Sequence, residues 1–402
     1  MTLPARDAEA SPARTLLAGR RVLTGGEAVA HAMRQVAPDV VPVYPITPQT
    51  PIVETFARFV AGGAVATEMV DVESEHSAMS AAVGASLAGA RVMTATASQG
   101  LALMIEVLYI ASSMRAPLVM AVGNRALSGP TNIHCDHSDS MLARDSGAVQ
   151  LFVEDAQEAY DFTIMATRLT EHADVRVPVL VALDGFTITH SAEPVAILDD
   201  AVVREFVGEY HATHSLLDVR RPTTQGTLAM PDVFFEFKRQ QAAAVDAALG
   251  AFVDIAREFG RLSGRSYDLV EPYRLADADR AIVLLGSTAG TVKEVVDELR
   301  ERGERVGLLT LRALRPLPRA AMRSALAPVS RVAVLDRAMS PGGPAPLYAD
   351  LAATLRDPGV ALHSYVYGLG GRDLEPAQIR RLFAELSAPG RPEMTGYIGL
   401  RE

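Results

Sequence analysis

Four short segments of the chain carry side chains that could act together in catalysis. They are Tyr44–Pro48 (YPITP), Val72–His76 (VESEH), Thr96–Gly100 (TASQG) and Gly123–Arg125 (GNR). Each segment follows a short apolar run that is typical of a buried strand. Because parallel α/β sheets bind ligands at the carboxyl ends of their strands, we expect the four segments to meet in one crevice. Their carboxylate, hydroxyl, amide and guanidinium groups suit proton transfer and anion binding.

The carboxylate in this group has two candidates. Glu75 stands at the start of a predicted helix over 74–88, where the positive end of the helix dipole favours an ionised acid. Such an acid can also serve only to stabilise the helix end. Glu73 competes for the same role, and spacing alone does not separate the two residues.

The segments 123–125 and 44–48 offer side chains that could bind an anion. Arg125 follows an apolar run, and its planar guanidinium suits a carboxylate; a surface ion pair with Asp145 is the alternative. Thr47 precedes Pro48, which biases its backbone to an extended form and could aim its hydroxyl into the crevice. Its hydroxyl could instead cap the following helix.

Two further polar runs need an interpretation. Ser98 and Gln99 could present hydroxyl and amide donors at the next helix start, or could form a tight turn. The run His134–Asp139 (HCDHSD) has two histidines three residues apart, but it lacks a recognised zinc pattern. We expect a polar loop that lines a pocket, with hydrogen-bonded histidines and no metal held by this chain.

Short apolar runs alternate with helical patterns over the first 185 residues, which predicts a parallel α/β sheet. Thr24 with Glu27 predicts a capping box and a helix to about Val36, and Thr50-Pro51 predicts the start of the next helix. The other expected helices are 74–88, 100–113 and 154–172, and the expected strands are 40–44, 65–70, 91–95, 117–123 and 177–183.

The pattern breaks after Gly185. A polar, irregular stretch with one helix near 234–259 follows, and a second, smaller doubly wound α/β unit is predicted from Asp279, with strands at 281–285, 305–309 and 332–335. The expected organisation is therefore an N-terminal arm at 1–20, a first domain at 21–185, a connector lobe at 186–278 and a second domain at 279–402.

Composition excludes several classes of protein. The 38 basic residues are outnumbered by 48 acidic ones, giving a net charge of −10, and the basic residues are scattered, which argues against a nucleic-acid partner. No apolar run approaches the ~20 residues of a membrane-spanning helix, and no secretory signal is visible. We expect a cytoplasmic protein.

Cys135 is the only cysteine. One thiolate excludes an internal disulfide and any iron–sulfur cluster held by this chain alone. The two lysines, Lys238 and Lys293, lie outside any Gly-rich loop. A P-loop is therefore excluded, and neither a Schiff-base lysine nor a nicotinamide-binding fingerprint has support.

Taken together, the motifs resemble those of the α subunits of the 2-oxoacid:ferredoxin oxidoreductases, and most closely the pyruvate:ferredoxin type. The resemblance extends from about Arg21 to Tyr397. It rests on YPITPQT (44–50), ESEHSAMSAAVGASLAGAR (73–91), TASQGLALM (96–104), NIHCDHSD (132–139), RDSG (144–147), DGFTITH (184–190), VGLLTLRALRPLP (306–318) and VAVLDRAMSPGG (332–343).

The resemblance implies a fold and a set of residue roles. The fold would pair a pyrimidine-binding thiamine-diphosphate domain with a domain similar to the transketolase C-terminal domain. Glu75 would hydrogen-bond N1′ of the aminopyrimidine, and Thr47 and Arg125 would bind the 2-oxoacid, with Arg125 on its carboxylate. The cofactor-binding residues expected beside Glu75 are Pro45, Ile46, Ser98 and Gln99.

The resemblance also implies partners. A β subunit would hold the diphosphate and Mg²⁺, and γ and δ subunits or domains would hold [4Fe-4S] clusters that pass electrons singly to ferredoxin. Coenzyme A would accept the acyl group, and this chain would be inactive alone. Pyruvate is the favoured substrate, although Ala148 follows RDSG where many members carry an aromatic residue. The alternatives are a branched-chain, aryl or dicarboxylic 2-oxoacid, or a non-catalytic scaffold.

Overall fold

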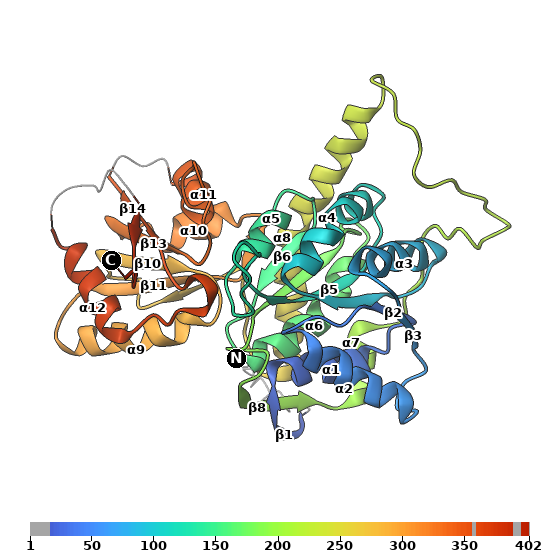
Figure 1. Cartoon of the computed structure of the whole chain (residues 1–402), viewed down its shortest axis with the longest axis horizontal. Coiled ribbons are helices and arrows are strands. Elements are labelled where there is room, and N and C mark those ends of the chain that lie inside the picture. The colour runs from blue at the N-terminus through green and yellow to red at the C-terminus, as the bar shows by residue number, and fades with distance from the viewer. Residues whose placement is uncertain (1–16, 356–358, 389–394, 402) are drawn as a thin grey trace, which may run out of the picture.

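The computed structural model describes residues 17–355, 359–388 and 395–401. Two α/β units lie side by side in it (Figure 1), and a long helix projects from the larger, N-terminal one. Residues 1–16 of the expected N-terminal arm lie outside the described part. Residues 17–20 instead begin a strand, β1 (Leu17–Thr24).

The first unit is built on a mainly parallel sheet. Strands β4 (Met93–Thr96), β5 (Val119–Asn124), β7 (Val179–Asp184) and β6 (Val149–Phe152) are parallel neighbours in this order. The parallel pair β2 (Val40–Val43) and β3 (Glu68–Asp71) approaches β4 through a bridge between Val40 and Val92. The predicted parallel α/β sheet is confirmed.

The predicted helices cover this sheet. They are α1 (Gly25–Val36), α2 (Thr50–Ala61), α3 (Glu75–Ala88), α4 (Ser98–Ser113) and α6 (Ala156–Glu171). The short helix α5 (Ser138–Ala143) was not predicted. The capping box at α1 is present, because the Thr24 hydroxyl accepts from Glu27 N and the Glu27 carboxylate accepts from Thr24 N. Pro51 lies in the first turn of α2.

Strand β6 was not among the predicted strands, and two long-range strand pairings were not predicted either. Strand β1 forms an antiparallel ribbon with β8 (Ala192–Leu198). Strand β12 (Ala313–Arg315) comes from the second half of the chain and adds antiparallel to β6, as the edge of the first sheet. Neither pairing has a local signal, because partners more than 150 residues apart are chosen by tertiary packing.

The connector contains more structure than the sequence predicts. Helix α7 (Asp200–Val207) follows β8, and α8 (Phe234–Ser263) is the one helix expected there, although it runs four residues beyond the predicted end. The C-terminal two-thirds of α8 packs against α6 and the hydrophobic core of the first unit.

The second unit is a six-stranded sheet with the order β15-β14-β13-β10-β11-β9. Its strands are β9 (Val270–Tyr273), β10 (Arg280–Leu284), β11 (Val306–Leu311), β13 (Arg331–Asp336), β14 (Ala361–Val366) and β15 (Gly396–Tyr397). All pairings are parallel except that of the edge strand β9. Strand β9 belongs to this sheet although it lies before Asp279, where the second unit was expected to begin.

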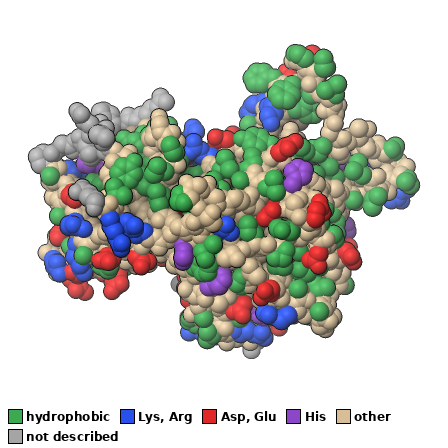
Figure 2. Space-filling model, in the orientation of Figure 1, with side chains coloured by type: hydrophobic (Ala, Val, Ile, Leu, Met, Phe, Trp, Pro, Cys, Tyr) green, Lys and Arg blue, Asp and Glu red, His purple; other side chains and the backbone are tan. Residues whose placement is uncertain are grey.

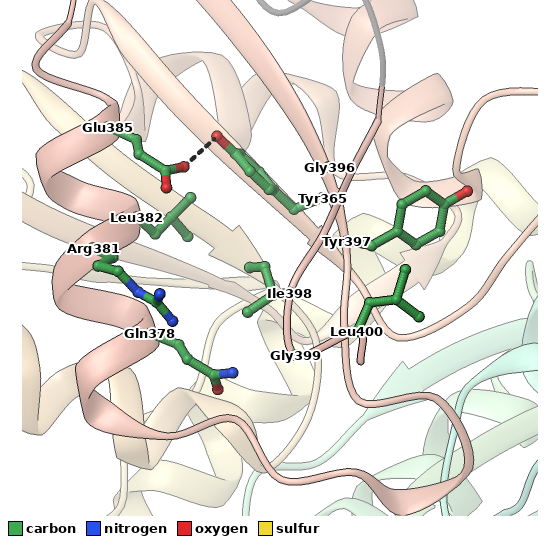
Figure 3. Close-up of a pocket in the computed structure, with 10 residues that line it drawn as sticks. All are labelled: Tyr365, Gln378, Arg381, Leu382, Glu385, Gly396, Tyr397, Ile398, Gly399 and Leu400. Carbon is green, nitrogen blue, oxygen red and sulfur yellow. Dashed lines mark hydrogen bonds between the residues drawn. The ribbon is translucent and has the colours of Figure 1, made fainter. Parts of the chain in front are cut away.

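Helices α9 (Thr288–Glu301), α10 (Arg319–Ala325), α11 (Pro346–Thr354) and α12 (Pro376–Glu385) flank this sheet, with a short 3₁₀ turn at Leu369–Gly371. A cavity of about 520 Å³ opens between α12 and the C-terminal segment, where the Tyr365 hydroxyl donates to Glu385 (Figure 3). No helix among the described residues is both long enough and apolar enough to span a membrane.

Candidate active site at the strand ends of the first sheet

Glu75 is the first residue of α3, and its position depends on a glycine. The Ser74 hydroxyl caps the helix by accepting from Ser77 N at 3.2 Å. The Glu75 side chain then lies over Gly100, where an added Cβ would be 2.7 Å from Glu75 Oε1 and 2.5 Å from Thr96 Oγ1. Only glycine at position 100 therefore leaves room for the carboxylate.

The structure separates Glu75 from Glu73. Glu73 is exposed, and the Ser77 hydroxyl donates to its carboxylate, which lowers the pKa of Glu73. Glu75 is buried, and no described residue donates a hydrogen bond to its side chain. The nearby Thr96 hydroxyl is also buried without a partner. Because buried polar groups are normally hydrogen-bonded, the pair points to a bound group that the protein does not itself supply.

Arg125 lies at the carboxyl end of β5 and joins the other predicted segments. Its Nη1 donates to the Thr47 carbonyl oxygen at 2.8 Å, and its Nη2 donates to Gln99 Oε1 at 3.3 Å. Its Nε donates to the Asn132 carbonyl at 3.1 Å. All three acceptors are uncharged, and no described carboxylate forms an ion pair with Arg125. The guanidinium keeps its full charge available for an anion.

The expected alternative partner of Arg125 is wrong. Asp145 instead lies 3.7 Å from Arg144 and 3.9 Å from Arg315. The reason is topological, because Asp145 follows α5 whereas Arg125 ends β5.

The segment 44–49 places Thr47 beside Arg125. Thr47 is exposed, and the residue that precedes α2 is Gln49, so the alternative in which Thr47 caps this helix is wrong. Gln49 holds the segment together, since its Nε2 donates to the Tyr44 carbonyl at 3.1 Å and its backbone N donates to the Ile46 carbonyl at 3.0 Å. Pro45 is exposed and Ile46 is half-buried on the same segment.

Ser98 and Gln99 form the first turn of α4 rather than a free turn. Ser98 is fully buried in a left-handed conformation, with φ of 47°. Its hydroxyl lies 2.6 Å from Gln99 Oε1 and 2.6 Å from the Ala126 carbonyl. Gln99 Oε1 thus accepts from both Ser98 and Arg125. The predicted residues Thr47, Ser98, Gln99 and Arg125 form one hydrogen-bonded group, and Glu75 contacts it at Gly100.

The residue that organises this group was not predicted for that role. Asp139 is fully buried in α5, and its Oδ2 accepts from Ser98 N at 2.9 Å and Arg125 N at 3.0 Å. Its Oδ1 accepts from Asn124 Nδ2 at 2.8 Å and Ser140 N at 2.7 Å. Burial raises the pKa of Asp139 to about 6 despite these donors. The only hint in the sequence is an acid beside a histidine-rich run.

The loop His134–Asp139 contacts the second unit. It lies between the two units, where Asn132 Nδ2 donates to Gly370 O at 3.1 Å and His137 N donates to Arg337 O at 2.7 Å. His137 is hydrogen-bonded as predicted, but its partner is Asp184 at 2.7 Å. The loop therefore joins the units.

Asp184 is the centre of this junction. Arg337 Nη1 donates to it at 2.8 Å, and the Ser287 hydroxyl at 2.6 Å. Burial alone would raise the pKa of Asp184, but the neighbouring His137 and Arg337 hold this pKa below its usual range. The Cys135, His137 and Asp184 ligand atoms lie close enough to hold a metal ion, but Arg337 already neutralises Asp184 and burial raises the pKa of the Cys135 thiol.

Family models match most of the chain. Residues 31–255 match the thiamine-diphosphate-binding domain of pyruvate flavodoxin/ferredoxin oxidoreductases, and residues 278–379 match core domain II of pyruvate:ferredoxin oxidoreductase. Among curated proteins, pyruvate synthase subunit PorA of Thermotoga maritima is 56% identical over 95% of this chain and 98% of its own length. The PorA of Methanocaldococcus jannaschii is 46% identical over the same shares.

Solved structures share the fold at low sequence identity. The 2-oxoglutarate:ferredoxin oxidoreductase of Magnetococcus marinus, solved with 2-oxoglutarate, coenzyme A and succinyl-CoA, has a TM-score of 0.72 at 22% identity. That match covers 92% of this chain and 65% of the longer solved chain. A split-gene transketolase has a TM-score of 0.52 at 13% identity and covers 90% and 93% of the two chains. Both confirm the predicted α/β fold. The chain belongs to the pyruvate:ferredoxin/flavodoxin oxidoreductase family, of which it carries the thiamine-diphosphate-binding domain and core domain II.

Proposed function

We propose that the chain is the α subunit of a pyruvate:ferredoxin oxidoreductase. The assembled enzyme would convert pyruvate and coenzyme A to acetyl-CoA and CO₂, with two electrons passing singly to ferredoxin. The observation that carries this proposal is the buried Glu75 carboxylate without a protein partner, in a chain 56% identical to a PorA subunit over nearly its whole length.

The residues around Glu75 fit the thiamine group that the family implies. Glu75 is a buried residue that accepts no hydrogen bond from a described residue, the Thr96 hydroxyl is buried without a partner, and Gly100 leaves room for both side chains. A ring nitrogen that carries a proton would satisfy the carboxylate. Glu75 would hold that proton at N1′ of the aminopyrimidine, which is a general acid/base role. When bound, thiamine diphosphate supplies the nucleophilic carbon that attacks the 2-oxo group.

Arg125 would bind the carboxylate of the 2-oxoacid. Its three hydrogen bonds to neutral oxygens fix the guanidinium without cancelling its charge. A fixed, unpaired guanidinium is suited to a planar carboxylate. Thr47 is exposed beside it and would contact the substrate, while Gln99 and Ser98 would hold the guanidinium and the start of α4. Pro45 and Ile46 would form the wall of the cofactor site.

Partner chains must supply the remaining chemistry. One cysteine cannot hold a [4Fe-4S] cluster, which needs about four thiolates, so the clusters would belong to γ and δ subunits or domains. A β subunit would hold the diphosphate and Mg²⁺, and coenzyme A would take the acyl group. We propose a cytoplasmic location for this complex.

A larger 2-oxoacid is the second candidate substrate. The ketoisovalerate oxidoreductase subunit VorA of Pyrococcus abyssi is 39% identical over 91% of this chain and 93% of its own length. The change from a methyl to a branched substituent alters pocket volume and leaves the Arg125–carboxylate contact unchanged, so both substrates are compatible with the same charged residues.

The test is reduction of a viologen dye by the chain co-expressed with its genomic neighbours. Thiamine diphosphate, Mg²⁺ and coenzyme A are supplied together with pyruvate, 2-oxoisovalerate, an aryl 2-oxoacid or 2-oxoglutarate. Faster turnover with pyruvate than with the others supports the proposal. Preference for 2-oxoisovalerate changes the substrate and keeps the chemistry, whereas an intact complex that reduces no dye with any 2-oxoacid contradicts a catalytic role.

A further inference from the structure

A long arm projects from the first unit, and it has no role in the site described above. The arm is defined as residues 209–237, from the end of α7 to the first turn of α8. Residues 209–233 contain no helix or strand, and structureless connections of this length inside a folded domain are usually functional. The first buried side chain of α8 is Gln241, so the helix begins clear of the body (Figure 1).

Hydrogen bonds hold only the base of the arm. The Ser215 hydroxyl donates to the Ala88 carbonyl at 2.5 Å, and Leu216 N donates to the Leu87 carbonyl at 2.9 Å. From residue 217 to residue 237, no hydrogen bond or ion pair between described residues reaches the body. The bonds within the arm are local, such as that from Arg221 to Asp218. Beyond its base, the arm is therefore held to the body by packing alone, as where Gly226 lies against the Met114 side chain.

The arm exposes an unusual number of large apolar side chains. Val219 is 89% exposed, Leu228 is 86% exposed and Phe235 is 78% exposed. The full set is Leu216, Leu217, Val219, Leu228, Met230, Val233, Phe234, Phe235 and Phe237. Figure 2 shows hydrophobic side chains gathered on the projection. Single exposed apolar residues are ordinary, but four of these residues lie together at the start of α8, namely Val233, Phe234, Phe235 and Phe237, and an apolar cluster of this kind marks an interaction site.

A cavity of about 1010 Å³ lies between the arm and the body, and its charge is one-sided. Arg115, Arg176, His214 and Lys238 line it, and no aspartate or glutamate does. Lys238 is bonded to the neutral Gln241, and none of the three Arg and Lys residues forms an ion pair with a described acid. This local excess of positive charge stands in a chain whose net charge is −10.

Arg115 and Arg176 repel each other, and the described acids offset this repulsion only in part. Arg115 donates to the backbone carbonyls of Val175 at 2.7 Å and Asp174 at 3.2 Å, which do not neutralise it. Burial and the charge of Arg176 lower the pKa of Arg115, while the charge of Asp174 opposes this only in part. A carboxylate placed in the cavity would relieve this repulsion.

We propose that the arm and the cavity beneath it bind an acidic, apolar-flanked segment of a partner subunit. An Asp or Glu of that segment would lie opposite Arg176 and Lys238, and its apolar side chains would pack on Leu228, Phe234 and Phe237. A small anion could neutralise the cavity but would leave the apolar arm in water. A symmetric contact with a second copy centred here would oppose like charges, because isologous contacts use the same surface on both chains.

The first test is site-specific crosslinking in the complete co-expressed complex. A photo-crosslinking amino acid replaces Phe235, and in a control complex it replaces Arg302, an exposed residue of the second unit. Mass spectrometry then identifies the crosslinked peptides. We expect position 235 to crosslink to a peptide of another subunit that contains Asp or Glu, and position 302 not to reach that peptide. Crosslinks confined to this chain or to a second copy of it would overturn the proposal.

The second test reverses the charge of the cavity. The double variant Arg176→Glu/Lys238→Glu should weaken retention of the partner subunit at least about tenfold. Added salt should change retention less in this variant than in the wild-type complex, because salt screens the charges that the variant removes. Arg257→Glu, on the exposed face of α8, is the matched control and should retain the partner. Replacing the crosslinked partner acid by lysine should restore binding to the double variant, which a misfolded chain could not do. Unchanged retention in the double variant would contradict the proposal.

Discussion

Arg125 Nη1 donates a hydrogen bond of 2.8 Å to the carbonyl oxygen of Thr47, which lies 78 positions earlier in the chain. The contact joins the segment after β2 to the end of β5. Thr47 reaches Arg125 through its backbone, so the hydroxyl of this exposed residue stays available. The same guanidinium contacts Gln99, and the three segments thus lie together at one place where Arg125 forms no ion pair with an acid in the part of the chain that the structure describes.

Replacing Glu75 by glutamine should abolish most thiamine-dependent turnover. Glutamine keeps the size of the side chain but cannot accept and release a proton as a carboxylate does. General acid/base groups contribute roughly 10²- to 10⁴-fold to the reaction rate. Dye reduction by the assembled complex measures the loss. Glu73→Gln is the control, because Glu73 is exposed and bonded to Ser77. A fully active Glu75→Gln complex would refute the role of Glu75.

Gly100→Ala should displace the carboxylate of Glu75 without changing that residue itself. The new methyl group would lie 2.7 Å from Glu75 Oε1, so the carboxylate must move. We expect kcat to fall by at least about tenfold, since small displacements in an active site are costly. Gly84→Ala, on the same helix as Glu75, has no atom within 4 Å of the added methyl group. That control should keep its activity, and a Gly100→Ala complex with the same kcat would contradict the predicted contact.

Arg125→Ala should raise the KM for the 2-oxoacid and leave thiamine binding almost intact. Loss of a charged contact to a bound carboxylate is worth about 2–5 kcal/mol, which corresponds to an increase of roughly 30-fold or more. KM is measured by dye reduction and thiamine affinity by fluorescence titration of the complex. Arg302→Ala, at the exposed position that follows the last residue of α9, provides the comparison. If substrate binding and cofactor binding weakened equally, the specific role of Arg125 in binding the substrate carboxylate would be contradicted.

Asp139→Asn should change the pH dependence of both activity and stability. Burial raises the pKa of Asp139 to about 6, so wild-type activity should fall below that pH as a protonated carboxyl stops accepting from Ser98 N and Arg125 N. The folded-state pKa exceeds the unfolded one, so this group's stabilising contribution is present below about pH 4 and is lost as pH rises through 6. The difference is roughly 3 kcal/mol for two pKa units.

Urea unfolding of the wild-type chain and the Asp139→Asn variant at pH 4 to 8 measures this contribution. The wild type should lose unfolding free energy relative to the variant between about pH 4 and pH 6. A constant difference across the whole range would show that Asp139 does not titrate there.

Asp184→Ala should destabilise the junction of the two units. It would leave Arg337 buried without its carboxylate, and breaking a buried ion pair costs about 3–5 kcal/mol. The lowered pKa of Asp184 means that its stabilisation is present at neutral pH and is lost only as pH falls through the folded-state pKa. Asp145→Ala, an exposed position, should cost much less in the same urea titration. Equal midpoints for the two variants would contradict this assignment.

The sequence by itself determined the local elements and the class of chemistry. Periodicity, the Thr24/Glu27 capping box and Pro51 located helices to within two residues at most ends, because these signals act over one helical turn. Strand ends also indicated where the site lies, since a parallel sheet binds ligands at one edge. One cysteine was sufficient to exclude an iron–sulfur cluster held by this chain alone.

The tertiary structure alone decided which of these residues lie together. Glu75 was separated from Glu73 by burial over Gly100, and Arg125 from Asp145 by the position of α5. Asp139 at the site, Asp184 at the junction and β12 in the first sheet depend on contacts between residues distant in sequence. Their energies come from burial and hydrogen bonding that exist only after the segments have packed, so no local pattern in the chain encodes them.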